Sequence, residues 1–410
     1  MIHDQLSSEI INSLRLKEIE INTLFEVTQA INNNFSEDDL YKIFKFTLSA
    51  NLNIQKIALF ALDETWKCKA NYGTSEDFSL IPFNETFLQF RSLTLIKDEY
   101  TNTPFSEFEL LMPVYHKERI LANLFLGGIA TTKSGTQLST NFLQALTNII
   151  IVAIENKKLV REQLKQEAVR RDIEIARQLQ FSMLPKILPY TDDIQLAAHY
   201  LPHDSLGGDY YDFIEVDKDQ FLLCIGDVSG KGVPAALLMS NIQASLRIII
   251  RQTTDITKII HELNLSVVQN SNREKFITLF LALYNTKTKT MNYVNAGHNP
   301  PLLLRKDSKK IELLEKGTTI LGSFDPLPFV EEGIIENLSH FLLFTYTDGL
   351  VEVFNEQNEE FGIERLEDFV LSHKENNLQE MHEKLIHDLS QFKGKEIFPD
   401  DITILTCRIK

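Results

Sequence analysis

The chain has 410 residues, longer than one ordinary domain, so we expect about two or three folded units. Hydrophobic residues make up 43% and charged residues 24%, as in typical globular proteins, which excludes a mostly disordered or collagen-like chain. The 41 basic and 57 acidic residues give a net charge of −16 at pH 7. A chain this acidic is a poor match for nucleic-acid phosphates, and we expect no nucleic-acid partner.

The cysteines and the apolar runs bear on where the protein works. Cys68, Cys224 and Cys407 lie far apart and form no C-x-x-C motif, so neither a disulfide framework nor a thiolate zinc site is expected. The first residues lack the basic and then apolar pattern of a signal peptide. No apolar run approaches the ~18–20 residues of a membrane span. We therefore expect a cytoplasmic protein with no membrane association.

The first part of the chain alternates helical and strand patterns. Apolar residues at steps of three and four predict an amphipathic helix over 7–31. Ser36, followed by three acidic residues, predicts the N-cap of a second helix that ends near Leu52. A closing helix is predicted from about Ser139. Between them, apolar runs predict three strands, with a charged turn at 117–119: residues 56–62, 110–115 and 120–128.

This order of helix, strands, hairpin and helix, over residues 32–154, resembles a GAF domain, a small sensory α+β module. The resemblance implies a sensor with an antiparallel sheet, whose ligand is a small molecule such as a bilin or a cyclic nucleotide, or only another protomer. The sequence leaves these alternatives open. Cys68 lacks the histidine neighbour that bilin attachment often shows, so we interpret it as a buried or incidental thiol.

Residues 155–185 form a linker of a different character, rich in charges of both signs and without glycine. Their apolar positions recur at steps of three and four, which predicts a helix with an imperfect heptad register that ends at Pro185. Two interpretations stay open: a parallel, coiled-coil-like dimer, and a single helix packed on its neighbours. In the dimer, the apolar seam would comprise Leu164, Val169, Ile173, Ala176 and Leu179.

From residue 194 the pattern changes to strands broken by aspartate and glycine, with two predicted helices over 233–251 and 256–269. Aspartates recur at the ends of the apolar runs: Asp209, Asp227, Asp348 and the pair Asp400-Asp401. A single Asp-Gly at a strand end is usually a turn. Several such carboxylates at one sheet edge would repel each other, and divalent cations such as Mg²⁺ or Mn²⁺ would resolve that repulsion.

Five segments carry a second resemblance. They occur in one order: GGDYYDF (207–213), GDVSGKGVPAALLM (226–239), YVNAGHNPP (293–301), LFTYTDGLVE (343–352) and DDITIL (400–405). Residues 190–410 thereby resemble the PPM metal-dependent protein phosphatases, in the SpoIIE and RsbU branch. The resemblance implies an αββα sandwich, in which two antiparallel sheets are flanked by helices, within a chain that is α+β throughout.

The same resemblance implies a site for two Mn²⁺ or Mg²⁺ ions between the sheets. Asp227 would bridge them with the carbonyl of Val228 beside it, Asp209 would serve one ion, and Asp348 and Asp400 the other. Asp401 is the alternative to Asp400 as ligand. A water activated by the ions would hydrolyse phosphoserine or phosphothreonine without a phosphoenzyme.

Three further residues are candidates for contact with phosphate or for catalysis. The family often holds the substrate phosphate with an arginine near the start of the domain, but no motif places one here, and Arg177 is interpreted as a surface residue of the linker. Lys231 lies beside the metal motif, where it would touch phosphate or simply complete a tight turn. His298 is interpreted as structural, because hydrolysis by a metal-activated water has no essential need of it.

The expected whole is a signalling serine/threonine phosphatase, with a terminal helix (1–31), a GAF-like sensor (32–154), a linker (155–185) and a phosphatase domain (186–410). Its expected partners are a phosphorylated protein, such as an anti-sigma-factor antagonist, and a second copy of the chain. One alternative is a phosphatase-like scaffold without catalysis, although all four matched positions keep aspartate. A diguanylate cyclase is disfavoured, because Tyr210-Tyr211 replaces the second acidic residue of that signature.

Overall fold

The computed structural model describes residues 2–96, 100, 103–129, 140–203, 205–271, 274–306 and 308–410, the side chains of residues 2–9 and 12 excepted. The chain divides into two compact units, Met1–Ala168 and Val169–Lys410. The division falls inside the segment 155–185, and the four sequence-based domain boundaries stay predictions.

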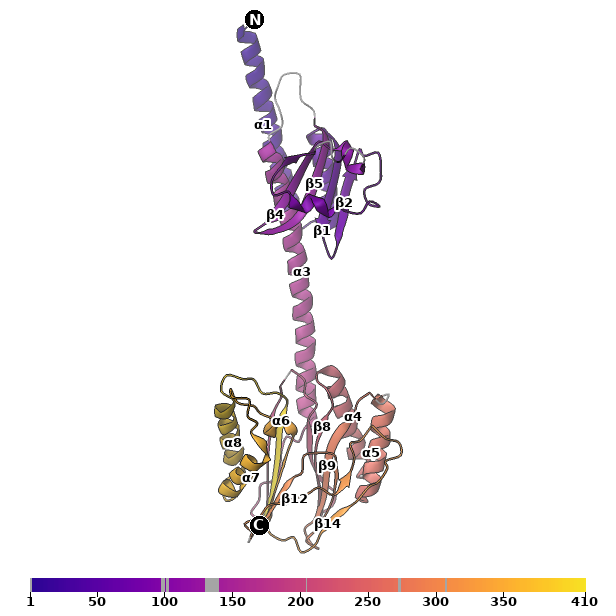
Figure 1. Ribbon diagram of the computed structural model, residues 1–410, viewed down its shortest axis with the longest axis vertical. Helices are drawn as coiled ribbons and strands as arrows, with labels where there is room; N and C mark the ends of the chain where they lie inside the picture. Colours follow the sequence, from indigo (N-terminus) through magenta and orange to yellow (C-terminus); the bar gives the residue numbers. More distant parts are fainter. Residues whose placement is uncertain are drawn as a thin grey trace. The chain divides into compact units, whose positions relative to one another are not determined.

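The N-terminal unit is one five-stranded antiparallel sheet with helices on one face (Figure 1). The strand order is β2-β1-β5-β4-β3. The strands are β1 (Ile54–Leu62), β2 (Trp66–Tyr72), β3 (Thr94–Leu95), β4 (Leu110–His116) and β5 (Arg119–Ile129). Helices α1 (Ile2–Asn32), α2 (Glu37–Phe46) and α3 (Thr140–Met183) supply side chains to the apolar core on that face, among them Val27, Phe44 and Leu146.

The sequence-based helices of this unit are confirmed, with one difference. Ser36 caps α2, since its Oγ accepts a hydrogen bond from the backbone N–H of Asp39 at 3.2 Å, and a π-helical turn (Thr47–Asn51) continues the helix. The closing helix and the linker helix, predicted separately, are one continuous helix of 44 residues, α3. The predicted start at Ser139 lies outside the described residues. The layout agrees with the expected order of elements, and the GAF assignment itself stays a prediction.

The other face of this sheet carries a cluster of aromatic side chains. Phe60 and Phe125 project from the sheet and pack against Phe78, Phe87 and Phe105 of the long connections. Ring centroids lie 4.8–6.3 Å apart at steep angles, the geometry that aromatic pairs favour.

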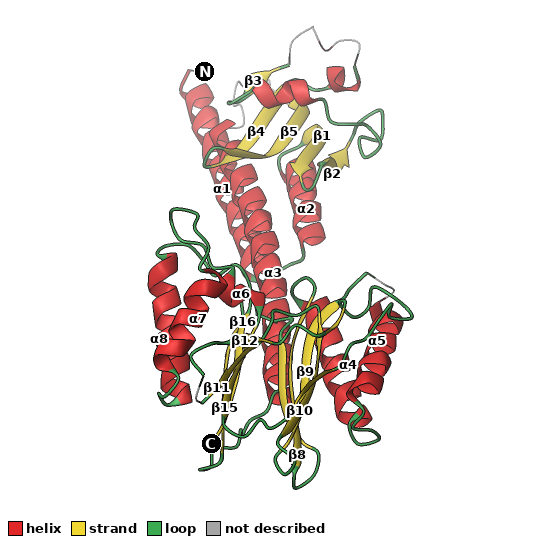
Figure 2. Ribbon diagram, turned by 60° about the horizontal axis from the view of Figure 1, so that its bottom comes forward, coloured by secondary structure: helices red, strands yellow, loops and turns green. Residues whose placement is uncertain are grey.

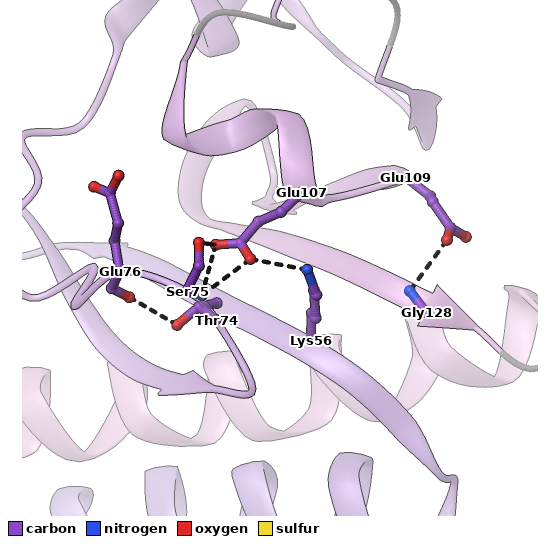
Figure 3. Close-up of polar contacts among 7 residues, drawn as sticks. All are labelled: Lys56, Thr74, Ser75, Glu76, Glu107, Glu109 and Gly128. Carbon is purple, nitrogen blue, oxygen red and sulfur yellow. Dashed lines mark hydrogen bonds and ion pairs between the residues drawn. The ribbon is translucent and has the colours of Figure 1, made fainter.

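A carboxylate fixes the connections that cover this cluster (Figure 3). Glu107, in the short turn Pro104–Glu107, accepts hydrogen bonds from the backbone N–H and the hydroxyl of Ser75, at 3.1–3.3 Å. Its Oε2 also forms an ion pair with Lys56 of β1 at 3.0 Å. The Glu107 side chain is only 10% exposed, so these contacts compensate the loss of its hydration. Ser75 follows β2, and Glu107 therefore ties three segments together.

The C-terminal unit is a sandwich of two sheets between helices (Figure 2). The first sheet has the order β13-β10-β9-β8-β7, with β14 paired to β10, and the second has the order β12-β11-β15-β16-β6. The first comprises β7 (Tyr210–Glu215), β8 (Gln220–Val228), β9 (Ile277–Asn285), β10 (Thr290–Ala296), β13 (Gly317–Thr318) and β14 (Gly333–Ile335). The second comprises β6 (Ile194–Leu201), β11 (Leu302–Arg305), β12 (Glu312–Leu313), β15 (Phe341–Tyr346) and β16 (Ile402–Ile409).

Helices cover both outer faces of the sandwich. Helices α4 (Val233–Ile249) and α5 (Ile256–Ser271) pack on the first sheet, and α7 (Gly362–His373) and α8 (Leu378–Lys393) on the second (Figure 2). This arrangement is the αββα sandwich that the sequence predicted. One detail differs: the short pair β10–β13 is parallel, whereas the sheets were predicted as antiparallel.

Burial on both faces explains the long apolar runs of this unit. In β15, Phe341 and Leu343 face the other sheet, while Leu342 and Phe344 face the helices. Since successive side chains point to opposite faces, both faces must be apolar when both are covered. No helix in the described ranges is both long and apolar enough to cross a membrane.

Candidate active site at one end of the two sheets

Both sheets end in aspartates at the same end of the sandwich. Asp209 lies just before β7 and Asp227 near the end of β8, and these strands pair with Tyr210 opposite Gly226. In the other sheet, Asp348 begins the short helix α6 (Asp348–Val351) after β15, and Asp400-Asp401 precedes β16. These strands pair with Tyr346 opposite Ile404. Antiparallel pairing therefore brings the end of one strand to the start of its neighbour in each sheet.

Asp209 joins the two sheets. Its Oδ2 accepts hydrogen bonds from the hydroxyls of Thr347, at 2.8 Å, and Thr403, at 2.5 Å, which both belong to the second sheet's end. Asp209 is 2% exposed. Burial, followed by the negative charges of Asp227 and Asp401, raises the pKa of Asp209 well above its usual range, and the two threonine hydrogen bonds oppose that rise.

Glycines permit the close backbone packing around Asp209. A Cβ on Gly207 would lie 1.9 Å from the Tyr200 hydroxyl, and a Cβ on Gly208 would lie 2.8 Å from the carbonyl oxygen of Val228. The 207–208 backbone therefore lies directly against the end of β8, where the predicted ligand Val228 is buried. Only glycine fits at these two positions, which gives the Gly-Gly-Asp motif a physical cause.

Asp401 has a different role from its neighbour. Its Oδ1 accepts a hydrogen bond from the backbone N–H of His203 at 2.7 Å, and its Oδ2 from that of Gly208 at 2.8 Å. The residue is 6% exposed, and burial raises the pKa of its carboxyl. Asp401 thus holds the loop that leads to Asp209, an arrangement that engages both of its oxygens.

Asp227 and Asp348 face other carboxylates. Burial, and then the charges of Asp348 and Asp400, raise the pKa of Asp227 to about 7. Burial, and then the charge of Asp400, raise the pKa of Asp348. Both carboxyl groups therefore lie in a region of concentrated negative charge, where each disfavours ionisation of the other.

Asp400 accepts a hydrogen bond at Oδ1 from the backbone N–H of its neighbour in the chain at 2.8 Å. Its side chain is 42% exposed and forms an ion pair with Lys231 at 3.2 Å. Lys231 also donates a hydrogen bond to the carbonyl of Pro399 at 2.6 Å. Lys231 thus lies at the site, as the sequence suggested, but its ammonium group is engaged by the chain itself.

Within the described residues, neither Arg177 nor His298 forms a hydrogen bond or ion pair with these carboxylates. Arg177 forms an ion pair with Glu174 at 2.7 Å and lies over the ring of Phe181, as expected of a surface residue of the helix. His298 is 4% exposed, and its Nδ1 lies 2.9 Å from the Thr278 hydroxyl. Burial lowers the pKa of His298 to about 4. These surroundings agree with a structural histidine.

Sequence reasoning missed several residues that shape the site. Thr347 and Thr403 hold Asp209, and their positions one residue before Asp348 and two residues after Asp401 were the available signal. Gln180, near the end of α3, donates from Nε2 to the carbonyl of Gly207 at 2.7 Å and accepts from the Gly207 N–H at 3.3 Å. Lys275 donates to the carbonyl of Ser229 at 3.0 Å. For these last two contacts the sequence contained no local signal.

The donor set fits a hard divalent cation. Carboxylates and a backbone carbonyl are oxygen ligands of the kind that Mg²⁺ and Mn²⁺ prefer, and a bound cation would compensate the charges that raise these pKa values. Among the described residues, however, no group of three or more acidic, histidine or cysteine side chains is already drawn together closely enough to hold an ion. Oδ2 of Asp209 is bonded to its two threonines, and Oδ2 of Asp400 is paired with Lys231. Binding would require these side chains to converge.

Comparison with known proteins identifies the class. Residues 217–410 match the family described as Stage II sporulation protein E (SpoIIE). The SiaA PP2C domain of Pseudomonas aeruginosa superposes with a TM-score of 0.53 at 20% identity, covering 60% of this chain and 99% of that one. The fold of the C-terminal unit is therefore the PP2C fold.

Two relatives from Bacillus subtilis make the assignment more specific. Phosphoserine phosphatase RsbU is 30% identical over 251 residues, which cover 60% of this chain and 72% of RsbU. Phosphoserine phosphatase RsbP is 26% identical over 245 residues, covering 59% of this chain and 58% of RsbP. The chain belongs to the SpoIIE family of PP2C-type protein serine/threonine phosphatases, as the five motifs indicated.

Proposed function

We propose that this phosphatase hydrolyses phosphoserine or phosphothreonine on a partner protein and that it requires two Mn²⁺ or Mg²⁺ ions. The ligands proposed are Asp209, Asp227, Asp348, Asp400 and the carbonyl of Val228. The observation that carries the proposal is that carboxylates of both sheets lie at the same end of the sandwich, where burial and neighbouring negative charges raise the pKa values of Asp209, Asp227 and Asp348. Such a cluster is costly without a cation.

The chain's own residues would prepare the site. Thr347 and Thr403 orient Asp209 toward the interior, and Asp401 fixes the loop that presents it. Lys231 holds Asp400 beside Asp348. When bound, a pair of divalent ions lowers the pKa of water and neutralises the charge of a phosphate. Because Lys231 is already engaged, its contact with a substrate phosphate would require exchange of its present partners.

The test is a phosphatase assay on the full chain with phosphoserine proteins from the same genome and with para-nitrophenyl phosphate. Activity should vanish after chelation and return with Mn²⁺ or Mg²⁺. Asp227→Asn should abolish both the activity and Mn²⁺ binding measured by calorimetry. Asp192→Asn, at an exposed aspartate outside the site, is the matched control and should change neither.

Two outcomes would contradict the proposal. Full activity after exhaustive metal removal would exclude the metal-dependent mechanism. Normal Mn²⁺ binding without hydrolysis of any phosphorylated substrate would instead favour the phosphatase-like scaffold. The names of RsbU and RsbP support phosphoserine as the substrate class.

The N-terminal unit is proposed as the regulatory part, a GAF-like sensor that acts through α3 in a homodimer. Its helix-covered sheet, with an aromatic cluster on the second face, supports this reading. Leu164 and Val169 are 65% and 58% exposed in the single chain, which supports a partner for these apolar side chains.

A further inference from the structure

A basic pocket lies at the end of the second sheet that is remote from the aspartates. Its floor is a row of side chains across three neighbouring strands, Leu304 of β11, Leu342 of β15 and Arg408 of β16, which are register partners. The cavity has a volume of about 310 Å³. Strand β15 begins here and ends just before Asp348, six residues later. At ~3.3 Å per residue, the pocket lies roughly 20 Å from the candidate active site.

The charge of this pocket is opposite to that of the chain. Six of its eleven lining residues are basic and one, Glu375, is acidic, although acidic residues outnumber basic ones by 57 to 41 in the whole chain. The basic residues are Arg305, Lys306, His340, Lys374, Arg408 and Lys410. Arg305 pairs with Glu312 at 2.9 Å. Within the described residues, Lys306, Lys374, Arg408 and Lys410 have no carboxylate within ion-pair distance. Glu375 lies in the same pocket and favours the charged form of Arg408, so the positive charge of the pocket is compensated only in part.

Arg408 is central because it is half-buried and bonded only to neutral groups. Its Nη2 donates to the carbonyl of Lys374 at 2.6 Å and its Nη1 to Oε1 of Gln195 at 3.4 Å. Burial lowers the pKa of Arg408, the expected effect of removing water from a cation. A guanidinium group presents up to five N–H donors in a planar fork that suits phosphate oxygens, so this residue retains donor capacity.

We propose that this pocket binds a small organic phosphate. The phosphate would lie against Arg408 and Lys374, and the apolar part of the molecule over Leu304 and Leu342. A volume of about 310 Å³ is at the lower end for ligand pockets, which suits a molecule of the size of a nucleoside monophosphate or smaller. Neither the proposed metal ligands nor the substrate protein takes part in this site.

The test is a titration of the full chain, with divalent metal chelated, by adenosine monophosphate, inorganic phosphate and adenosine. Methyl resonances of Leu304 and Leu342 are local reporters that separate this pocket from the active site. Adenosine monophosphate should shift them in a saturable way and bind at least tenfold more tightly than either other probe. Arg408→Gln and, separately, Lys374→Gln should weaken this binding at least tenfold. Arg251→Gln, at an exposed arginine outside the pocket, should leave it unchanged.

Three results would overturn the proposal. The first is the absence of shifts at the two leucines, and the second is unchanged affinity in a Lys374→Gln variant that folds normally. The third is equal affinity for inorganic phosphate, since the apolar floor would then have no part in recognition. Because Arg408 is half-buried, the circular dichroism of each variant is compared with that of the parent chain before titration.

Discussion

Asp400 and Asp401 are neighbours with the same side chain, yet their different surroundings give them different roles. Asp400 is 42% exposed, pairs with Lys231 and accepts the backbone N–H of Asp401, whereas Asp401 is buried and accepts the backbone N–H groups of the loop before Asp209. The family resemblance implied Asp400 as the ligand, with Asp401 as alternative. The geometry supports that choice, because Asp400 is partly exposed and its charge raises the pKa of both Asp227 and Asp348, whereas Asp401 is buried against the loop before Asp209.

We predict that Asp400→Asn lowers kcat by about two orders of magnitude or more, since a metal-ion site contributes several kcal/mol to hydrolysis. The free energy of unfolding of the Asp400→Asn variant should hardly change, because an exposed ion pair contributes at most about 1 kcal/mol. Asp401→Asn should instead lower the free energy of unfolding by about 1–3 kcal/mol, since an amide nitrogen would face one of two N–H donors. Steady-state kinetics and urea unfolding of both variants measure this difference. A greater loss of Mn²⁺ affinity in Asp401→Asn than in Asp400→Asn would reverse the assignment.

His382 makes the stability of the C-terminal unit depend on pH. It is fully buried in α8, with Nε2 2.8 Å from the Thr406 hydroxyl, and burial, followed by the charge of His199, lowers its pKa to about 3. The unfolded chain takes up a proton near pH 6.5, while the folded chain does not. The stabilisation is therefore complete above pH 6.5 and falls as the pH drops toward 3.

We predict that this histidine alone lowers the free energy of unfolding by about 2 kcal/mol between pH 7.5 and pH 5. Urea unfolding at both pH values measures the loss, which should shrink by that amount in His382→Gln. His261→Gln, at an exposed histidine, is the control and should keep the pH dependence of the parent. An unchanged pH dependence in His382→Gln would show that folding does not lower the pKa of His382.

At the scale of elements, Gln180 connects helix α3 to the active-site loop. Its buried amide exchanges two hydrogen bonds with Gly207, two residues before Asp209. We predict that Gln180→Ala lowers kcat about tenfold while the metal ligands stay intact, because the loop loses its hold on the helix and Asp209 becomes less well positioned. Gln178→Ala removes an exposed amide one half-turn away and is the matched control.

The measurements are kcat, KM and Mn²⁺ affinity of both variants. A loss confined to stability, with unchanged kcat, would mean that Gln180 only anchors the helix. Equal effects of the two substitutions would point to a general weakening of α3.

At the scale of the molecule, the apolar side chains in the linker part of α3 bear on whether the chain is a monomer or a dimer. Nine residues separate Leu164 from Ile173, which is two and a half turns of a helix, so the two lie on opposite faces. The predicted seam is therefore not one straight stripe. Pairing would require a shift of register between Leu164 and the group that begins at Val169.

We predict that the full chain is a dimer and that Leu164→Glu and Val169→Glu weaken it, with a change in phosphatase rate. Both side chains are more than half exposed in the single chain, so glutamate there is tolerated unless a partner covers the position. Light scattering and phosphatase assays compare these variants with Gln163→Glu, which adds the same charge about 100° around the helix from Leu164. The hypothesis would be contradicted if the parent chain is a monomer and both variants have its phosphatase rate. The linker would then only connect the two units.

Local pattern was enough to predict the class and most of the elements. The five motifs led to the phosphatase family, alternating and continuous apolar runs located the strands, and Ser36 marked the start of α2. These features depend on neighbours in the chain, such as helix caps, turns and runs of apolar residues. The candidate ligands were located for the same reason, because each aspartate lies at the end of its own strand.

Tertiary structure alone decided which groups these residues meet. The threonines that hold Asp209, the amide link from Gln180 to Gly207, and the different environments of Asp400 and Asp401 join residues far apart in the sequence. The row of Leu304, Leu342 and Arg408 likewise exists only because three strands pair in one register. The physical reason is that burial and charge depend on distance in space. The order of residues determines which side chains lie at the end of each strand. The raised pKa values of the aspartates arise only when the two sheets bring these side chains together.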